Sequence, residues 1–204
     1  MRWGRVEVTW GFCLMAAWIN YLDRQGIFLL ALAGCALHEL GHYIMIRFLG
    51  GDIKSVRLTA VGAEMELNSP MGYCQEGLAA LAGPGMNLLA ALLFCRWTWG
   101  RTFSGLNLVL GCFNLLPVSV MDGGRAMACT LSMLAGPELA GAVGKGMDLS
   151  FTAAMLACGV LLAGARGNFT MLLVALWLAA LFFGRGKEHK SKSSRCQKFS
   201  DGCK

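Results

Sequence analysis

A short motif with two histidines and one glutamate, HELGH at residues 38–42, lies in the middle of an apolar stretch over residues 26–49. This stretch is long enough to cross a lipid bilayer, which requires about 20 apolar residues. Ionisable side chains are costly at that depth, so their presence in such a segment usually marks a functional site. The motif therefore predicts both a membrane-spanning helix and a polar site inside that helix.

The spacing of the motif indicates a metal site. On a helix, positions i and i+4 share one face, so His38 and His42 can bind the same metal ion. Glu39 lies beside them, where its carboxylate can act as a base toward a water activated by the metal. We interpret this pattern as that of a zinc hydrolase, and its position in an apolar helix predicts a protease that cuts within the membrane.

The composition supports an integral membrane protein. The 204 residues are 56% hydrophobic and only 15% charged, which is more apolar than an ordinary soluble domain. We therefore expect an all-α membrane protein with about six transmembrane helices, formed by residues 1–184. Several of the apolar segments are short, so tilting or partial insertion is expected. The six segments are residues 6–22, 26–49, 76–97, 103–120, 149–165 and 169–184.

Residues 185–204 form a basic segment that contains seven of the 18 Lys and Arg residues. Its polar composition predicts a disordered tail. With six spans, the side of the membrane that holds both termini carries fourteen Lys and Arg residues and the other side carries four. Because basic loops stay in the cytoplasm, both termini are predicted to be cytoplasmic. The tail has one aromatic residue, Phe199, and no folded motif, so no nucleic-acid partner is expected.

Residues 52–68, between the second and third apolar segments, alternate between apolar and polar side chains. This alternation, with Gly62 where a turn would fall, predicts a small β-hairpin. An ordinary interfacial loop is the alternative. As a hairpin, the segment could bind an extended substrate peptide by strand addition.

A catalytic zinc usually has three protein ligands and one open position. The third histidine of the chain, His189, lies in the basic tail and is a poor candidate for the remaining ligand. Asp122 is a better candidate, because Pro117 interrupts the preceding helix and Gly123 and Gly124 permit a close backbone approach. Asp122 could also cap a helix that starts near Gly124, and both interpretations remain open on these grounds.

Three motifs, in their order and spacing, resemble those of the site-2 protease family of intramembrane zinc metalloproteases (peptidase family M50). They are HELGH at residues 38–42, the pattern Gly-Pro-x-x-Asn at residues 83–87, and Asn-x-x-Pro-x-x-x-x-Asp-Gly at residues 114–123. The resemblance covers roughly residues 6–133. The six-span layout resembles the branch that includes the stage IV sporulation protease FB.

This resemblance implies a specific chemistry. Asp122 becomes the third zinc ligand beside His38 and His42, and Glu39 becomes the catalytic residue of a zinc metalloendopeptidase. The implied substrates are membrane-embedded or membrane-tethered proteins, such as a pro-sigma or anti-sigma factor. The implied location is a bacterial cell membrane, in which the protein is a multi-pass component.

Two asparagines, Asn87 and Asn114, lie in otherwise apolar segments. Either side chain could bind the substrate or support the transition state. Either could instead form an interhelical hydrogen bond, as polar residues do in membranes. The hydrogen bond is the favoured interpretation for Asn87, and the two interpretations are even for Asn114.

Two other functions are compatible with a polar site in the membrane, namely a metal-ion transporter and a non-catalytic membrane binding protein. Intramembrane His and Asp residues also mark ion paths, but no inverted repeat is visible in the sequence. The intact Glu39 argues against a binding protein without catalytic activity. A di-iron site is excluded, because it requires a second Glu-x-x-His motif. A metalloprotease is therefore the predicted function.

Overall fold

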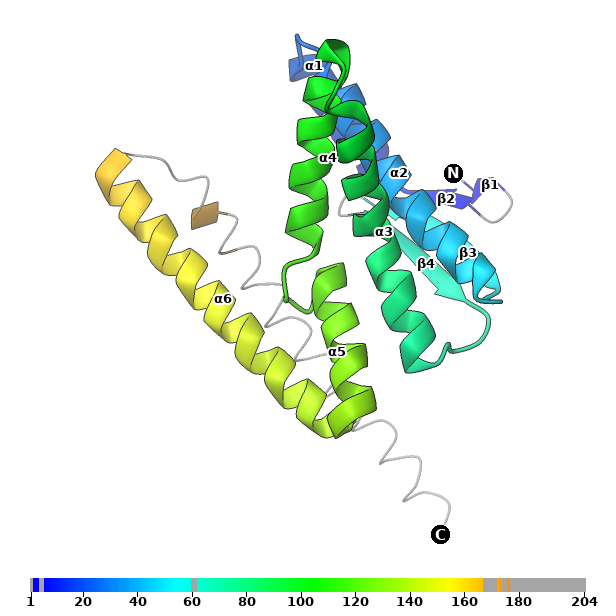
Figure 1. Ribbon diagram of the computed structural model, residues 1–204. Helices are drawn as coiled ribbons and strands as arrows, with labels where there is room; N and C mark the ends of the chain where they lie inside the picture. The colour runs from blue at the N-terminus through cyan, green and yellow to red at the C-terminus, as the bar shows by residue number, and fades with distance from the viewer. Residues whose placement is uncertain (1, 4–5, 60–61, 167–171, 174–175, 177–204) are drawn as a thin grey trace. The chain divides into compact units, whose positions relative to one another are not determined.

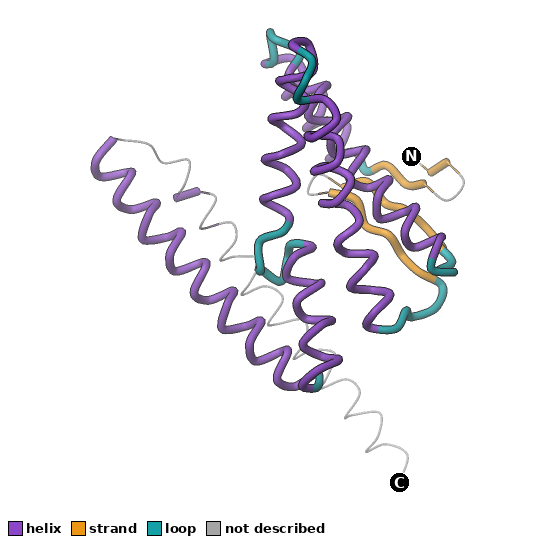
Figure 2. The backbone as a smooth tube through the Cα atoms, in the orientation of Figure 1, coloured by secondary structure: helices purple, strands orange, loops and turns teal. Residues whose placement is uncertain are grey.

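The computed structural model describes residues 2–3, 6–59, 62–166, 172–173 and 176, and most of these are helical (Figures 1 and 2). The chain divides into two compact units, Met1–Gly144 and Lys145–Lys204. The predicted metal ligands all belong to the first unit. The prediction of a mostly helical protein with a small hairpin is confirmed, while the predicted tail over residues 185–204 lies outside the described residues.

Six α-helices are described, and three of them are long and apolar enough to cross a membrane. These three are α2, α3 and most of α6, whereas α1 and α4 are shorter. The number of six spans therefore stays a prediction, and its sixth segment lies almost wholly outside the described residues. The helices are α1 (Trp10–Leu22), α2 (Ile27–Phe48), α3 (Tyr73–Phe94), α4 (Arg101–Asn114), α5 (Asp122–Ala135) and α6 (Pro137–Arg166), with a short 3₁₀ turn at Thr98–Gly100 before α4.

The prediction that the first apolar segment is helical from residue 6 is wrong at its start. Val6–Val8 form strand β2, and helix α1 begins only at Trp10. Thr9 lies between them in an extended conformation, and its side-chain oxygen accepts a hydrogen bond from the backbone N–H of Phe12 at 3.4 Å. A threonine in this position ends a strand and caps a helix, because its hydroxyl satisfies a free N–H of the first turn.

The sheet contains four strands in the order β1–β2–β3–β4. The predicted hairpin is formed by β3 (Ile53–Thr59) and β4 (Gly62–Leu67), which pair antiparallel with Val56 opposite Met65. The N-terminal strand β2 adds to the other edge of β3 in parallel, and β1 (Arg2–Trp3) pairs with β2. This addition was not predicted, since three residues are too few to give a recognisable alternating pattern.

The inner face of the sheet packs on one end of the helix pair α2 and α3, as Figure 2 also shows. The centre of this small core consists of Ile46 from α2, Ile53 from β3 and Ala79 from α3. Ile46 is one helical turn after His42, so the sheet is anchored at the end of α2 that carries the second histidine. The partly buried residues around this core are Met45, Val56, Met65, Leu67 and Met71.

Helix α3 is the centre of the first unit, because it contacts α2, α4 and α5 (Figure 1). Small residues allow these helices to approach closely: a β-carbon at Gly41 of α2 would lie 2.6 Å from the carbonyl oxygen of Ala82 in α3. Ser104 of α4 also donates a hydrogen bond to the carbonyl oxygen of Ala91 at 2.7 Å. Such close, small-residue contacts are a main source of helix association in membranes.

The second unit contains the C-terminal part of α6. In that part, Gly159 packs closely on the following segment, where a β-carbon would lie 2.9 Å from Cα of Leu172. The division of the chain into a membrane domain over residues 1–184 and a separate tail stays a prediction.

Candidate metal centre

Three buried side chains meet in the first unit: His38 and His42 from α2 and Asp122 from the start of α5. Nε2 of His38 lies 3.0 Å from Oδ2 of Asp122, and Nε2 of His42 lies 3.2 Å from the same oxygen. The two Nε2 atoms are 3.1 Å apart. Three atoms that can each donate an electron pair therefore surround one point, which is the arrangement of a metal site.

The dimensions of this group fit zinc. Zinc binds imidazole nitrogen and carboxylate oxygen at about 2.0–2.2 Å in tetrahedral geometry, which places neighbouring ligand atoms roughly 3.3–3.5 Å apart. The three distances in this group are 3.0–3.2 Å, so small shifts would accommodate the ion. Three protein ligands also leave the fourth position open, as in catalytic zinc sites.

The ring of His42 is held by α3. Its Nδ1 donates a hydrogen bond to the carbonyl oxygen of Ala79 at 2.7 Å. Because the proton is on Nδ1, Nε2 keeps the electron pair with which it can bind a metal. Gly83, one turn further along α3, lies directly against the ring, and a β-carbon there would overlap with Nε2 of His42.

His38 also contacts α3, through Asn87. The amide nitrogen of Asn87 lies 3.1 Å from Nδ1 of His38, and the Asn87 side chain is fully buried. The interhelical hydrogen bond predicted for Asn87 is therefore present, and its partner is a ligand of the candidate metal site. Because His42 lies near Ala79 and His38 lies near Asn87, α2 and α3 run antiparallel along the site.

Asp122 is the first residue of α5, and the cap of this helix is Met121. The alternative that Asp122 caps a helix starting near Gly124 is therefore wrong. The two glycines that follow Asp122 permit a tight turn, since a β-carbon at Gly123 or Gly124 would overlap with the carbonyl oxygen of Leu115 or Val118, respectively. This turn brings the carboxylate to the histidines of α2.

The outer oxygen of Asp122, Oδ1, faces Arg125, whose Nη1 lies 3.7 Å away. Arg125 in turn lies 3.7 Å from Oε1 of Glu76 in α3. About half of the Arg125 side chain is exposed, so these charge interactions are expected to contribute little to stability. They leave Oδ2 of Asp122 as the oxygen that faces the histidines.

Comparisons with known proteins support this interpretation of the site, although no family model matches the chain. The chain is 29% identical over 181 residues to a zinc metalloprotease of Methanocaldococcus jannaschii. This match covers 80% of this chain and 49% of that protein. It is 30% identical over 173 residues to a Synechocystis protein named provisionally as a zinc metalloprotease, covering 74% of this chain and 44% of that one. Among solved structures it resembles the site-2 protease from Methanocaldococcus jannaschii, with a TM-score of 0.65, 24% identity and coverage of 92% and 93% of the two chains.

The chain therefore shares the fold of the site-2 protease, and the curated relatives that it matches are named zinc metalloproteases, in one case provisionally. Three of its helices are long and apolar enough to cross a membrane, as expected for a multi-pass membrane protein. The chain spans about half the length of the curated relatives it matches. These relatives do not single out the sporulation branch, so that part of the resemblance stays a prediction.

Two other polar residues of the sequence motifs, Glu39 and Asn114, lie on α2 and α4 respectively. Glu39 follows His38 on α2 and is half-buried. The amide nitrogen of Asn114 donates a hydrogen bond to the carbonyl oxygen of Leu110, within its own helix, at 3.0 Å. Asn114 is thus the last residue of α4, and its role toward a substrate stays a prediction.

Sequence reasoning missed Asn107, which is fully buried in α4. Its amide nitrogen donates a hydrogen bond to the carbonyl oxygen of Phe103 at 2.9 Å. Its side chain packs on Gly34 of α2, where a β-carbon would lie 3.3 Å from Oδ1 of Asn107. The signal was the same as for Asn87 and Asn114, a single asparagine in an apolar segment.

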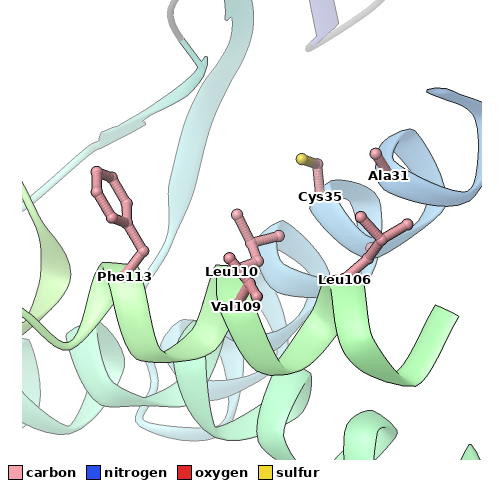
Figure 3. Close-up of a pocket in the computed structure, with 7 residues that line it drawn as sticks. Ala31, Cys35, Leu106, Val109, Leu110 and Phe113 are labelled. Atoms are coloured by element: carbon pink, nitrogen blue, oxygen red, sulfur yellow. The ribbon is translucent and has the colours of Figure 1, made fainter. Parts of the chain in front are cut away.

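An apolar cavity of about 240 Å³ lies between α2 and α4 (Figure 3). Cys35, three residues before His38, lines this cavity and so belongs to an apolar surface. The other lining residues are Ala31, Gly34, Leu106, Val109, Leu110 and Phe113.

Proposed function

We propose that this chain is an intramembrane zinc metalloendopeptidase that hydrolyses peptide bonds in or near transmembrane segments of membrane-tethered proteins. The observation that carries the proposal is the convergence of one atom each from His38, His42 and Asp122 within 3.2 Å of one another. Both histidines lie on a helix that is long and apolar enough to cross a membrane. A buried site of this kind has no purpose in packing alone, because ionisable groups are costly there.

Zinc held by His38, His42 and Asp122 would supply a Lewis acid that activates water and polarises the scissile carbonyl. The proton transfers fall to Glu39, which adjoins His38 and is half-buried. Its carboxylate accepts a proton from the attacking water and passes it to the leaving amine. Neither histidine is needed as a base, so each can keep its Nε2 for the metal.

The substrate must present an extended peptide, because the carbonyl groups of a helix are occupied by hydrogen bonds. Strand β4 is at one edge of the sheet, with β3 on its other side. An extended substrate segment could pair with this edge by strand addition. The sheet packs beside Ile46, one turn after His42, so a strand bound there would approach the end of α2 that carries the metal ligands.

The protein is proposed to sit in a bacterial cell membrane with both termini in the cytoplasm, in agreement with the bias of Lys and Arg residues. Arg47 at the end of α2 and Lys54 and Arg57 in β3 would then lie on the cytoplasmic side. A membrane-tethered transcription regulator, such as a pro-sigma or anti-sigma factor, is the proposed substrate. Regulated intramembrane proteolysis is the corresponding process.

The test is cleavage of candidate tethered regulators in proteoliposomes by the wild-type protein and by Glu39→Gln. We expect Glu39→Gln to lose cleavage but to keep zinc, because it removes the base and no ligand. Glu138→Gln, at an exposed position in the first turn of α6, is the matched control and should cleave normally. Normal cleavage by Glu39→Gln would refute the proposed mechanism, and zinc transport that survives this change would favour the transporter instead.

A further inference from the structure

We infer that Asn87 is a positioning residue that fixes the proton of His38 on Nδ1, and that it does so through its side-chain oxygen. The inference rests on the zinc site of the proposed function and extends it by assigning a role to a residue that does not touch the metal. It differs from the substrate-binding and transition-state roles considered for Asn87 from the sequence.

The first observation is an unpaired oxygen beside a metal ligand. Asn87 is fully buried, and its amide nitrogen lies 3.1 Å from Nδ1 of His38. Within the described part of the chain, the buried side-chain oxygens without a hydrogen-bond partner are Oδ1 of Asn87 and Oδ1 of Asn107. An unsatisfied buried oxygen is unfavourable, so each of these two cases requires an explanation.

The protonation of His38 in a zinc site decides which atom of the Asn87 amide should face its ring. To bind zinc, Nε2 of His38 must offer its electron pair, and the single proton of the neutral ring is then on Nδ1. Nδ1 becomes a donor, and the amide nitrogen of Asn87 is a donor too, so these two atoms cannot form a hydrogen bond in the zinc-bound state. The oxygen of Asn87 can accept the proton, if it takes the position of the nitrogen.

This exchange requires only that the amide group of Asn87 flip about the Cβ–Cγ bond, which exchanges the positions of its oxygen and nitrogen. The amide nitrogen and oxygen are similar in size and bonding distance, so the turn moves no other group. It places the oxygen about 3.1 Å from Nδ1 of His38. The oxygen then accepts the proton of Nδ1, which gives His38 the acceptor that a metal-binding histidine requires. The amide nitrogen takes the position in which the oxygen now has no partner.

The arrangement around His42 supports the same role. Nδ1 of His42 already donates to an oxygen of α3, the carbonyl oxygen of Ala79, at 2.7 Å. Helix α3 therefore supplies one acceptor oxygen to each histidine, one from the backbone beside His42 and one from the Asn87 side chain beside His38. Only the second of these can be removed by mutation.

The test compares zinc affinity in three full-length variants, measured by competition with a chromophoric chelator. Asn87→Leu removes the acceptor while keeping the size of the side chain, and we expect affinity to fall about 10- to 100-fold. Asn87→Asp keeps an acceptor oxygen in place and should bind zinc at least as tightly as the wild type. Asn107→Leu is the matched control, since Asn107 is equally buried and has the same unpaired oxygen but bonds to its own helix; its affinity should stay within about threefold.

A second measurement does not depend on any variant. The chain has only three histidines, so nitrogen NMR of histidine-labelled, zinc-loaded wild-type protein can assign the proton of each ring. We expect the proton of His38 on Nδ1, in a hydrogen bond to an oxygen. A proton-free Nδ1 in His38 would overturn the inference, even if the variants fail to fold.

The variant results also separate this inference from the proposed function. If the wild type binds zinc but Asn87→Leu binds it equally well, or if Asn87→Asp loses as much affinity as Asn87→Leu, the role of Asn87 is wrong and the metal site stands. If Asn107→Leu loses as much affinity as Asn87→Leu, the effect is one of helix packing and the inference fails. If the wild type binds no zinc, the proposed function itself fails.

Discussion

Oδ2 of Asp122 lies 3.0 Å from Nε2 of His38, although the two residues are 84 positions apart in the chain. The contact joins the start of α5 to the middle of α2, and α3 packs against both of these helices. We expect Asp122→Ala to lower zinc affinity at least tenfold and to abolish cleavage, because two ligands alone hold zinc poorly. Zinc analysis of the purified protein measures the first effect and a cleavage assay the second.

Asp52→Asn is the control for this prediction, since Asp52 is half-exposed and pairs with Arg47 at 3.4 Å, outside the metal site. It should bind one zinc and cleave normally. If Asp122→Ala keeps one tightly bound zinc per chain, Asp122 is not a ligand.

Gly83 provides a steric test of the same site. A β-carbon at this position would overlap with the ring of His42, and the backbone of α3 leaves little room to move because Ala79 and Pro84 are buried beside it. We expect Gly83→Ala to displace the His42 ring and to lower zinc affinity at least tenfold. The measurement is zinc affinity in a detergent solution in which circular dichroism shows that the helices are intact.

Gly85→Ala is the matched control for Gly83→Ala, because it lies two residues further along α3 and a β-carbon there would meet nothing within 4 Å. It should bind zinc as tightly as the wild type. Equal losses of affinity in the two variants would indicate a general defect of α3 rather than a clash with His42.

The hairpin contains a pH-dependent interaction that can be measured separately from the metal site. Nζ of Lys54 donates a hydrogen bond to Glu66 at 3.1 Å, and the hydroxyl of Ser55 donates another at 3.1 Å. These bonds stabilise the carboxylate and lower the pKa of Glu66 below its usual value. Because the pKa is lowered in the folded state, the stabilisation is present at neutral pH and is lost as the pH falls through that pKa.

Lys54→Met should therefore raise the pKa of Glu66 toward the usual value, since it removes both the main hydrogen bond and a positive charge. An NMR titration of a glutamate-labelled sample measures this change. Arg47→Met also removes one positive charge but pairs with Asp52 rather than Glu66, so it should leave the pKa of Glu66 nearly unchanged. An unaltered pKa in Lys54→Met would show that the pair does not form in solution.

The edge strand β4 can be tested by cross-linking. A photoreactive amino acid at position 66 in β4 should capture a tethered substrate in the Glu39→Gln background, where cleavage no longer releases it. The same amino acid at position 138, in the first turn of α6, should capture much less. Equal capture at both positions would contradict strand addition at β4.

The sequence predicted which three side chains converge better than it predicted what surrounds them. His38 and His42 could be recognised because two ligands one helical turn apart form a local pattern, and Asp122 because its signature resembles that of a known family. The close approach of Gly83 to His42, by contrast, depends on how α2 and α3 pack, which no local spacing encodes. The same holds for the carbonyl oxygen of Ala79, since every residue has a carbonyl and only the fold selects this one.

The fold shows the same division between local and non-local information. Alternation over residues 52–68 predicted the hairpin, because a strand pattern of this length is recognisable. The strand Val6–Val8 was predicted as part of a helix, since its position depends on pairing with β3 about 50 residues later. The short helices α1 and α4 also could not be judged as membrane spans from apolar composition alone.

The most direct test of the zinc site is X-ray absorption spectroscopy at the zinc edge on the purified Glu39→Gln protein. The spectrum should show one zinc bound by two imidazole nitrogens and by oxygen, with no sulfur, even though the chain contains nine cysteines. A spectrum with sulfur ligands, or with fewer than two imidazoles, would contradict the assignment of His38, His42 and Asp122 as the metal site.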